Sequence, residues 1–472
     1  MNLNRKSLVF SLTSAILIAT VTGAAFNMRG TSIAHAAPPP PPALAPTPVL
    51  SYFTDATGIY ETISSNGTNR PNNPFFQPLG TNGRACVTCH QPDEGWTITP
   101  AAIQAKFNQS GGNDPLFRTV DGSNSPNANV SDYNHKLSAY SMLLSKGLIR
   151  VGLPVPAKAE FQLTAVADPY GFASAAQLSL FRRPLAATNL SFLSTVMWDG
   201  RAVGGSGIIH DDLTAQAINA VATHMQGKVQ PSAAILSSIV GMESNLYTAQ
   251  VWDSGASSLY GGGAMGGPIA LTTAPFYPAI NDVTGLDPTG KAFNPNVFTM
   301  YKAWSTTNNS TPTMQDQASV ARGEQLFNNR QFAISGVAGL NDIAGVPVLP
   351  GTCASCHDTP SVGNHSIGDF LNIGIADASR RTPDMPLYTF RNIKTGTIVQ
   401  TTDPGRALVT GSWVDIGKFK VPIMRGLAAQ APYFHNGSAH TINDVINFYD
   451  QRFNIGFSPE EKSDLAAFLR TL

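Results

Sequence analysis

Apolar residues recur at helical spacing in several stretches of this 472-residue chain. Good helix formers and a continuous apolar face predict a buried helix over 213–225. Shorter helices are expected near 100–107 and over 319–327. The end of the chain, 458–472, begins with Ser458 as an N-cap, followed by proline and two acids, which predicts a terminal helix.

Other stretches lack helical periodicity. Residues 110–180 combine scattered Gly, Asn and Pro with short apolar runs, and the alternation over 161–166 predicts a small β-element among loops. The Gly, Pro, Ser and Thr content of 255–295 predicts a long irregular insertion, and 305–313 is typical of an interdomain linker. We therefore expect a mainly α fold with irregular loop and small β insertions.

The N-terminal segment, residues 1–36, is typical of a secretory signal peptide. Arg5 and Lys6 precede an apolar run, and Ala-His-Ala at 34–36 matches a small-x-small cleavage site. The alternative is an uncleaved anchor, because the apolar run approaches spanning length. The proline-rich segment 37–50 is expected to be a semi-rigid linker. The predicted location is the periplasm, with no membrane span in the mature chain.

Charged residues make up 13% of the chain, about half the ~25% of an ordinary soluble domain. Lys plus Arg and Asp plus Glu both number 30, so no basic excess is present to neutralise phosphates, which argues against a nucleic-acid partner. Cleavage after residue 36 would remove three basic residues and no acid, leaving a net charge of −3. This charge slightly favours a basic protein partner.

All four cysteines fall in two pentapeptides of the form Cys-x-x-Cys-His, which is the attachment pattern of c-type haem. The sequences are CVTCH at 86–90 and CASCH at 353–357. Two thiols on one helical turn reach the two vinyl groups of a porphyrin, and the adjacent histidine supplies the proximal nitrogen. Two covalently bound c-type haems are therefore predicted, attached at Cys86, Cys89, Cys353 and Cys356, with His90 and His357 as iron ligands.

Three other uses of these cysteines fit less well. A zinc site brings its Cys-x-x-Cys pairs within tens of residues, whereas Cys89 and Cys353 are 264 residues apart. A thioredoxin-like pair needs a βαβ context, which the pattern does not provide. Ordinary disulfides do not require a histidine after the second cysteine.

Further sequence blocks accompany the two pentapeptides, namely MWDGRA at 197–202, LTAQA at 213–217, DPGRALVTG at 403–411 and FKVPIMRGLAAQAPYFHNGS at 419–438. Together they resemble the bacterial dihaem cytochrome c peroxidases and the related MauG-like enzymes over most of 80–472. The resemblance implies two cytochrome c-like haem domains, a peroxidatic one over 51–312 and an electron-transfer one over 313–472. Residues 91–180 and 255–300 look like additions to that plan.

The resemblance also implies roles for single residues. His90 would bind the peroxidatic haem iron and His357 the electron-transfer haem iron. Trp198 matches the tryptophan between the haems, although a buried core tryptophan is the alternative. Arg406 and Arg425 lie in motifs whose arginines contact haem propionates, which suits the bidentate guanidinium.

The distal ligand of the second haem is a methionine in the peroxidases and a tyrosine in the MauG-like enzymes. The same position here is Tyr449, and no methionine follows Met424. A phenolate oxygen favours ferric and higher-valent iron. Tyr449 could instead pack against the terminal helix; His365, His435 and His440 are rival ligands, and the family motif favours a supporting role for His435.

Cleavage of peroxide needs a distal group that moves a proton from one oxygen to the other. The family uses a glutamine, matched by Gln216, and a glutamate about ten residues later, where this chain has Gln226. We predict His224 as the distal acid/base, because imidazole exchanges protons near neutral pH, with Gln226 as its hydrogen-bonding partner. A structural role for His224 is the alternative, and Glu243 is the reserve acid.

The family's interdomain calcium site is left open, because Gln430 replaces a threonine before Ala431-Pro432 while backbone carbonyls there could still bind calcium. The function implied is a periplasmic peroxidase that reduces hydrogen peroxide with electrons from a small cytochrome c or cupredoxin. One alternative is a MauG-like oxidase that acts on a protein or aromatic substrate through a high-valent dihaem state. The other is a simple dihaem electron carrier.

Overall fold

In the computed structural model, residues 48–306 and 310–472 are described, and they belong to a single unit. The predicted signal peptide, residues 37–47 of the predicted linker and residues 307–309 of the predicted interdomain linker lie outside the described residues. Strand β1 (Val49–Thr54) begins within the segment expected to be proline-rich linker.

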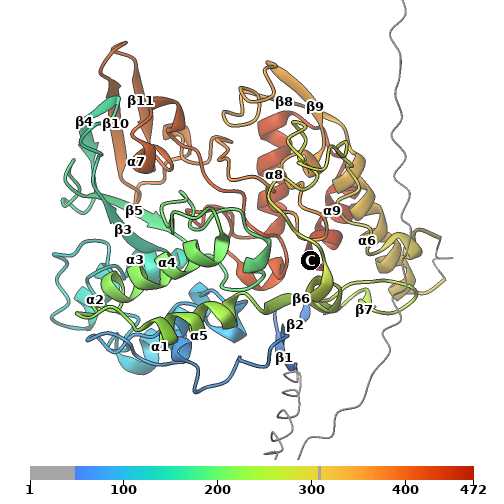
Figure 1. Ribbon diagram of the computed structural model, residues 1–472, viewed down its shortest axis with the longest axis horizontal. Helices are drawn as coiled ribbons and strands as arrows, with labels where there is room; N and C mark the ends of the chain where they lie inside the picture. The colour runs from blue at the N-terminus through green and yellow to red at the C-terminus, as the bar shows by residue number, and fades with distance from the viewer. Residues whose placement is uncertain (1–47, 307–309) are drawn as a thin grey trace, which may run out of the picture. The chain divides into compact units, whose positions relative to one another are not determined.

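Three helices pack together in the last third of the chain: α6 (Pro312–Asn329), α8 (Ile442–Phe453) and α9 (Pro459–Arg470) (Figure 1). Each begins at a side-chain N-cap, and Ser458 and Glu461 form a capping box at α9. The predicted helices over 319–327 and 458–472 are confirmed. Their apolar faces form a core against which Cys353 and Cys356 pack.

The first pentapeptide lies among α1 (Pro100–Ser110), α2 (Tyr133–Ala139), α3 (Ser141–Lys146), α4 (Ile209–Thr223) and α5 (Ala233–Glu243). The helices predicted near 100–107 and over 213–225 are confirmed as α1 and α4. Helix α4 starts earlier and ends earlier than predicted, so His224 caps its C-terminus. Cys86 packs against a core that contains Trp96, and Cys89 against one that contains Phe107.

A four-stranded antiparallel sheet joins segments that are far apart in the chain. Its order is β1-β2-β6-β7, where β2 is Gly58–Ser64, β6 is Leu246–Asp253 and β7 is Ser257–Ser258. Gly58 lies opposite Asp253 and Ser64 opposite Leu246. The C-terminus is held beside this sheet, because the backbone N–H of Gln250 donates to the carbonyl of Leu472 at 3.2 Å.

A second antiparallel sheet pairs β4 (Phe161–Ala167) with the hairpin of β10 (Leu387–Asn392) and β11 (Ile398–Thr401). The alternation predicted over 161–166 is confirmed by β4. Two smaller hairpins complete the strands, β3 (Ile149–Leu153) with β5 (Leu178–Arg182) and β8 (Phe332–Ser335) with β9 (Val348–Gly351). The second sheet therefore unites segments from both sides of the predicted domain boundary at 312/313, which stays a prediction.

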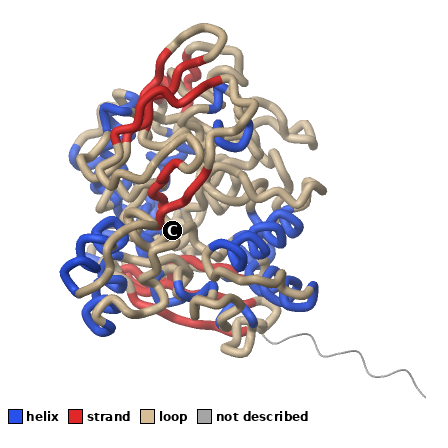
Figure 2. The backbone as a smooth tube through the Cα atoms, turned by 90° about the vertical axis from the view of Figure 1, so that its left-hand side faces the viewer, coloured by secondary structure: helices blue, strands red, loops and turns tan. Residues whose placement is uncertain are grey.

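The prediction of a mainly α fold is wrong. Helices account for 31% and strands for 17% of the described residues, and loops form much of the remainder (Figure 2). The strands are short, and their partners lie up to 231 residues away (Phe161 with Asn392), so local periodicity reveals β4 but not the extent of the sheets. The region 255–295 is irregular as predicted, with β7 and a short 3₁₀ turn, and α7 (Ala407–Thr410) is a single turn.

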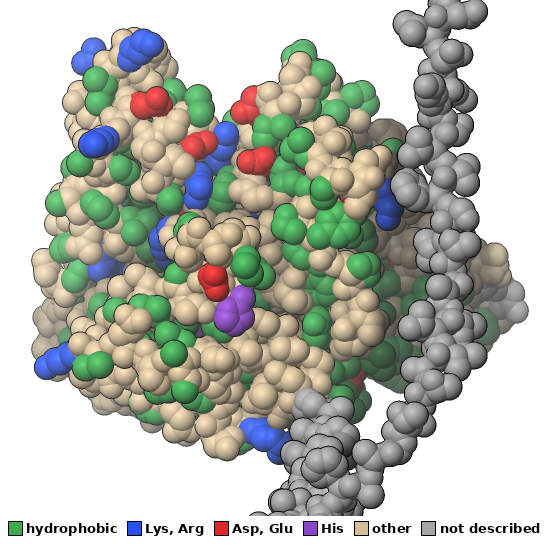
Figure 3. Space-filling view, viewed as in Figure 1, with side chains coloured by type: hydrophobic (Ala, Val, Ile, Leu, Met, Phe, Trp, Pro, Cys, Tyr) green, Lys and Arg blue, Asp and Glu red, His purple; other side chains and the backbone are tan. Residues whose placement is uncertain are grey.

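Within the described part of the chain, every helix is too short or too polar to cross a membrane. On the face shown in Figure 3, basic and acidic side chains are few and scattered among apolar and uncharged groups. This distribution agrees with the low charge content of the sequence.

Glu324 on α6 makes the free energy of unfolding depend on pH. It is fully buried, and its carboxylate accepts from the Tyr301 amide at 3.1 Å. Burial raises the pKa of Glu324 to about 7, although hydrogen bonds from the amides of Tyr301 and Met300 oppose the rise. The unfolded chain loses this proton near pH 4.5, whereas the folded chain keeps it to about 7. Stability therefore falls as pH rises through that window.

We expect Glu324→Gln to be more stable than the wild type at pH 8, by about 3 kcal/mol, and similar to it at pH 5. Urea unfolding at the two pH values measures the difference. The exposed Glu460→Gln is the matched control and should leave the pH dependence unchanged. An equal pH dependence in Glu324→Gln and the wild type would contradict the assignment.

Candidate functional site

Both pentapeptides adopt the same local conformation. Each forms one 3₁₀ turn, over Cys86–Thr88 and Cys353–Ser355. The amide of His90 donates to the Cys86 carbonyl at 3.0 Å, and the amide of His357 donates to the Cys353 carbonyl at 3.2 Å. None of the four cysteines forms a disulfide. The turn therefore brings two thiols and one imidazole together at each site.

The two histidines are held as neutral ligands. Nδ1 of His90 lies 3.2 Å from the Trp96 carbonyl, and Nδ1 of His357 lies 2.6 Å from the Gly363 carbonyl. A carbonyl can only accept, so Nδ1 carries the proton and Nε2 keeps its lone pair. Burial lowers the pKa of both imidazoles to about 4, against the effect of these hydrogen bonds. Neutral imidazole is the form that binds iron.

One internal cavity is lined by residues of both pentapeptides. Trp198 also lines it, and its indole N–H donates to the Arg183 carbonyl at 2.8 Å, which fixes the ring. His435 lies edge to face with Trp198 at 6.2 Å and stacks on Phe419 at 4.0 Å. The predicted site residues that meet at this cavity are Cys86, Cys89, His90, Trp198, Gln216, His224, Glu243, Cys353, Cys356, His357, Arg425, His435 and Tyr449.

Four residues singled out in the sequence lie outside the lining of this cavity. Gln226 is exposed, with a backbone φ of 53°. Arg406 donates to the carbonyls of Asp199 and Gly200 and covers the Phe370 ring at 4.5 Å. The imidazole of His365 is hydrogen-bonded to Asp358 away from this cavity, and His440 is exposed. The structure does not bring Gln226 to the side chain of His224.

The cavity is rich in cations. Six of its lining residues are Arg or Lys, and one, Glu243, is acidic. Three of the cations, Arg183, Lys420 and Arg425, are buried without a carboxylate partner among the described residues. Burial lowers the pKa of Lys420 to about 8 and that of the two arginines to about 10. Such groups need a counter-ion.

Haem propionates would supply the missing counter-ions, so the residues present fit the cofactor. Nε of Arg425 is buried without a partner, although Nη2 donates to the Gly267 carbonyl at 2.8 Å. Arg183 and Lys420 were missed by the sequence analysis, although Lys420 lies in the block 419–438. Arg183 also donates to the carbonyls of Gln430 (3.2 Å) and Ala431 (3.5 Å), which are among the backbone acceptors considered for calcium.

An aspartate–histidine pair faces the first site. Nδ1 of His224 lies 2.5 Å from a carboxylate oxygen of Asp121, whose other oxygen pairs with Arg84. Burial opposes ionisation of Asp121, but the hydrogen bond from His224 and the charge of Arg84 outweigh it and lower the pKa of the carboxyl. His224 is close enough to His90 to add, after burial, to the lowering of its pKa. Nε2 of His224 is thus free to exchange a proton.

Two further groups of the cavity can carry protons. Burial raises the pKa of Glu243 to about 8, and one of its oxygens has no hydrogen-bond partner. Burial, followed by the nearby thiols of Cys356 and Cys353, raises the pKa of Tyr449 well above its usual range. The Tyr449 hydroxyl makes no hydrogen bond with the described residues, so it is available to a ligand in the cavity.

Comparisons with known proteins identify relatives of part of this chain. No family model matches it. It is 31% identical over 135 residues to cytochrome-c peroxidase IdrP2 of Denitromonas iodatirespirans. The aligned residues cover 26% of this chain and 36% of that protein. It is 29% identical over 134 residues to cytochrome c551 peroxidase of Nitrosomonas europaea, and the aligned residues cover 28% of this chain and 34% of that protein. The chain thus spans about a third of the length of these relatives.

A solved structure, that of a MauG-like protein associated with microbial copper homeostasis, is similar at a TM-score of 0.38 and 15% identity. The similarity covers 85% of this chain and 86% of that protein. The sequence relatives confirm the kinship that the two pentapeptides and their accompanying blocks predicted. They are oxidoreductases by name, in agreement with the predicted class of enzyme.

Proposed function

We propose that this chain, which is related over 134–135 residues to bacterial cytochrome c peroxidases, is a periplasmic dihaem peroxidase. It would reduce one hydrogen peroxide with two electrons and two protons to two waters, taking the electrons from a small cytochrome or cupredoxin. The cavity that both pentapeptides line, with Trp198 in its wall, carries this proposal. The predicted signal peptide supports the periplasmic location.

The bound haems supply the redox chemistry and the site at which peroxide reacts, and the protein holds and orients them. Nε2 of His90 and Nε2 of His357 would be the iron ligands. Arg183, Lys420 and Arg425 neutralise propionates that would otherwise be buried without a counter-ion. Trp198, fixed by its hydrogen bond to the Arg183 carbonyl, offers an aromatic ring in the wall of the cavity that the two sites share.

The proton transfers fall to His224. Its Nε2 accepts the proton of the peroxide oxygen nearer the first haem and returns it to the farther oxygen, so that water leaves. The Asp121 carboxylate stabilises the imidazolium formed in between and fixes Nδ1 as the protonated nitrogen. Gln216 lines the same cavity, and its amide N–H can donate to peroxide.

Turnover by the intact holoprotein tests this function. The full chain, matured with its haems, should carry two haems per chain by intact mass and oxidise reduced cytochrome c when peroxide is added. Cys353→Ser/Cys356→Ser should carry one haem and lose this turnover, because the electron path from the donor is cut. Peroxide consumption no faster than that of free haem would overturn the proposal.

A MauG-like oxidase is the second candidate, and Tyr449 is the observation that favours it. Its unpartnered hydroxyl faces the cavity beside the second pentapeptide, and oxygen ligation there favours oxidised iron over electron storage. In that case the oxidising equivalents would pass to a protein or aromatic substrate. Slow oxidation of cytochrome c alongside rapid peroxide consumption would favour this candidate.

Replacing Tyr449 by Phe tests the ligand directly. We expect the absorption and electron paramagnetic resonance signals of the second haem to change and those of the first to stay, because the phenolic oxygen is the only atom removed. Tyr388→Phe, a buried tyrosine away from the cavity, is the control and should leave both signals unchanged. Identical spectra for the wild type and Tyr449→Phe would reject the assignment.

A further inference from the structure

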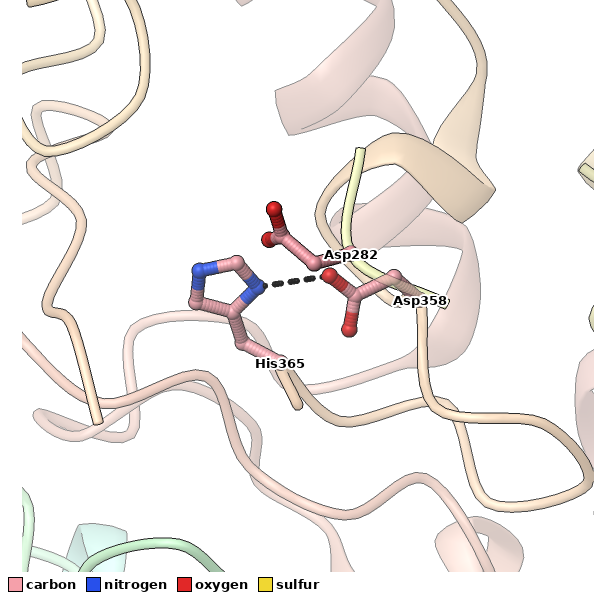
Figure 4. A group of neighbouring side chains, drawn as sticks. All are labelled: Asp282, Asp358 and His365. Carbon is pink, nitrogen blue, oxygen red and sulfur yellow. Dashed lines mark hydrogen bonds and ion pairs between the residues drawn. The ribbon is translucent and has the colours of Figure 1, made fainter. Parts of the chain in front are cut away.

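Three ionisable side chains meet outside the cavity that the pentapeptides line: Asp282, Asp358 and His365 (Figure 4). Asp282 comes from the irregular insertion, and the other two from the turn that follows the second pentapeptide. One potential ligand atom of each lies within 4.8 Å of the other two. Both aspartates are fully buried, and His365 is 4% exposed. The group is thus shielded from bulk solvent.

The charges of this group are not balanced by the protein. Asp358 pairs with Nδ1 of His365 at 2.9 Å, and neither aspartate pairs with a described Lys or Arg. One oxygen of Asp282 accepts from the Thr284 amide at 2.9 Å and the Leu286 amide at 3.0 Å. Two buried carboxylates beside one imidazole leave a net negative charge even when the imidazole is protonated, and burial makes such a charge costly.

Unsatisfied polar atoms concentrate at the same place. The second oxygen of Asp282 and Nε2 of His365 are buried without hydrogen-bond partners in the structure. The same holds for side-chain oxygens of three neighbours along the turn, Thr359, Asn364 and Ser366. Buried polar atoms are normally satisfied, so this group needs partners that the described side chains and backbone do not supply. A polar ligand with positive charge meets both requirements.

The geometry of His365 points to a metal rather than to an ammonium group. When the imidazole is neutral, its Nδ1 donates to the Asp358 carboxylate and Nε2 keeps a lone pair that a metal ion can take. A carboxylate behind the imidazole is the arrangement that commonly orients a metal-binding histidine. Figure 4 shows the second ring nitrogen turned away from Asp358, while Asp282 reaches toward the ring from a separate segment.

We propose that Asp282 and Nε2 of His365 bind a divalent metal ion while Asp358 orients the imidazole, with zinc as the ion that best fits imidazole and carboxylate donors. Calcium prefers an all-oxygen site. Zinc bonds of about 2.0–2.2 Å place ligand atoms roughly 3–4 Å apart. Ligand atoms that lie within 4.8 Å of one another therefore need only small shifts to bind one ion. The ion would join the insertion to the turn whose Gly363 carbonyl orients His357. The site does not depend on peroxide chemistry.

Metal analysis of the full-length holoprotein tests the site. After dialysis, elemental analysis should find about one zinc per chain in addition to the haem iron. Asp282→Asn, which keeps the shape but removes the charge, should reduce the zinc to below about a tenth of an equivalent. Asp358→Asn should weaken zinc binding by about 10- to 100-fold.

Asp287→Asn is the matched control, because Asp287 is a buried carboxylate of the same loop whose oxygens already accept from Thr289 and the Asn281 amide. It should keep the zinc. Zinc chloride added to chelator-treated wild type should raise the thermal midpoint, and the rise should be absent in Asp282→Asn. Unchanged haem spectra show that each variant is folded.

Wild type that contains no divalent metal and is not stabilised by zinc, manganese or calcium chloride would overturn the proposal. So would Asp282→Asn and His365→Gln variants that keep their zinc. Binding of manganese instead of zinc would retain the site and correct the ion. These outcomes are independent of turnover, so they do not bear on the peroxidase proposal.

Discussion

Replacing His224 by Ala should lower kcat/KM for peroxide by about 10²- to 10⁴-fold while both haems remain attached. This is the range that a positioned general acid/base contributes. His224 caps the end of α4 at the cavity wall, and its protonated Nδ1 is fixed by Asp121 at 2.5 Å. Stopped-flow measurement of the reaction with peroxide, together with the haem content per chain, checks the prediction.

Helix α4 offers a matched control. His210 lies in its first turn with a side chain that is 54% exposed, so His210→Ala removes an imidazole from the same helix without touching the cavity. It should leave the reaction with peroxide unchanged. A His224→Ala variant that retains peroxide reactivity within about threefold of the wild type would contradict the assignment and direct attention to Glu243.

The Asp121→Asn variant tests whether the imidazole of His224 must be held by Asp121 or need only be present. An amide can donate to Nδ1, so the substitution favours the tautomer with the proton on Nε2, which cannot accept one from peroxide. The loss should approach that of His224→Ala, and the double variant should be no worse than His224→Ala alone, because the two groups act as a unit. The pH profile should shift as well, which a purely structural role would not produce.

Local chemistry explains which parts of the fold could be predicted. The pentapeptides, the helix over 319–327 and the capped helix after Ser458 are each encoded within about fifteen residues, and the structure contains all of these elements. The pairing of β2 with β6 and of β4 with β10 is not encoded locally, because each partner is a short strand in a distant segment. The mainly α prediction failed for that reason.

In the candidate site, too, the locally encoded features could be predicted and the long-range contacts could not. Counting ten residues beyond Gln216 to reach Gln226 assumes that the helix continues, but α4 ends at Thr223 and Gln226 takes a positive φ that turns it to solvent. Asp121 was missed because a single carboxylate in a Gly- and Asn-rich stretch has no periodicity to mark it. Its pairing with His224 spans 103 positions and exists only in the folded chain.

Replacing Arg182 by Met should cost about 3–5 kcal/mol of stability, because it leaves a buried carboxylate without its counter-charge. Arg182, at the end of β5, donates to Asp199 at 2.6 Å and to both oxygens of Asp403 at 2.6 and 2.8 Å. The side chains of all three are at most 2% exposed. Arg201 still pairs with Asp199 in the variant, whereas Asp403 forms no other ion pair with a described Lys or Arg. Urea unfolding of the holoprotein measures the loss.

Arg322 on α6 makes the same kind of pair in a different environment. It donates twice to Asp464, both at 2.7 Å, but its side chain is 57% exposed. Arg322→Met should therefore cost less than about 1 kcal/mol. Equal costs for the two variants would mean that burial does not set the energy of these pairs.

The double variant Arg182→Met/Asp403→Asn identifies the source of the cost. If the penalty arises from a buried, uncompensated carboxylate, removing that charge should recover a large part of the lost stability. If it arises from lost packing against Phe419, over which the guanidinium lies at 5.8 Å, the double variant should be no more stable than Arg182→Met. Because this network joins β5 to the blocks 197–202 and 403–411, its loss should also loosen Trp198, detectable as faster exchange of its indole proton.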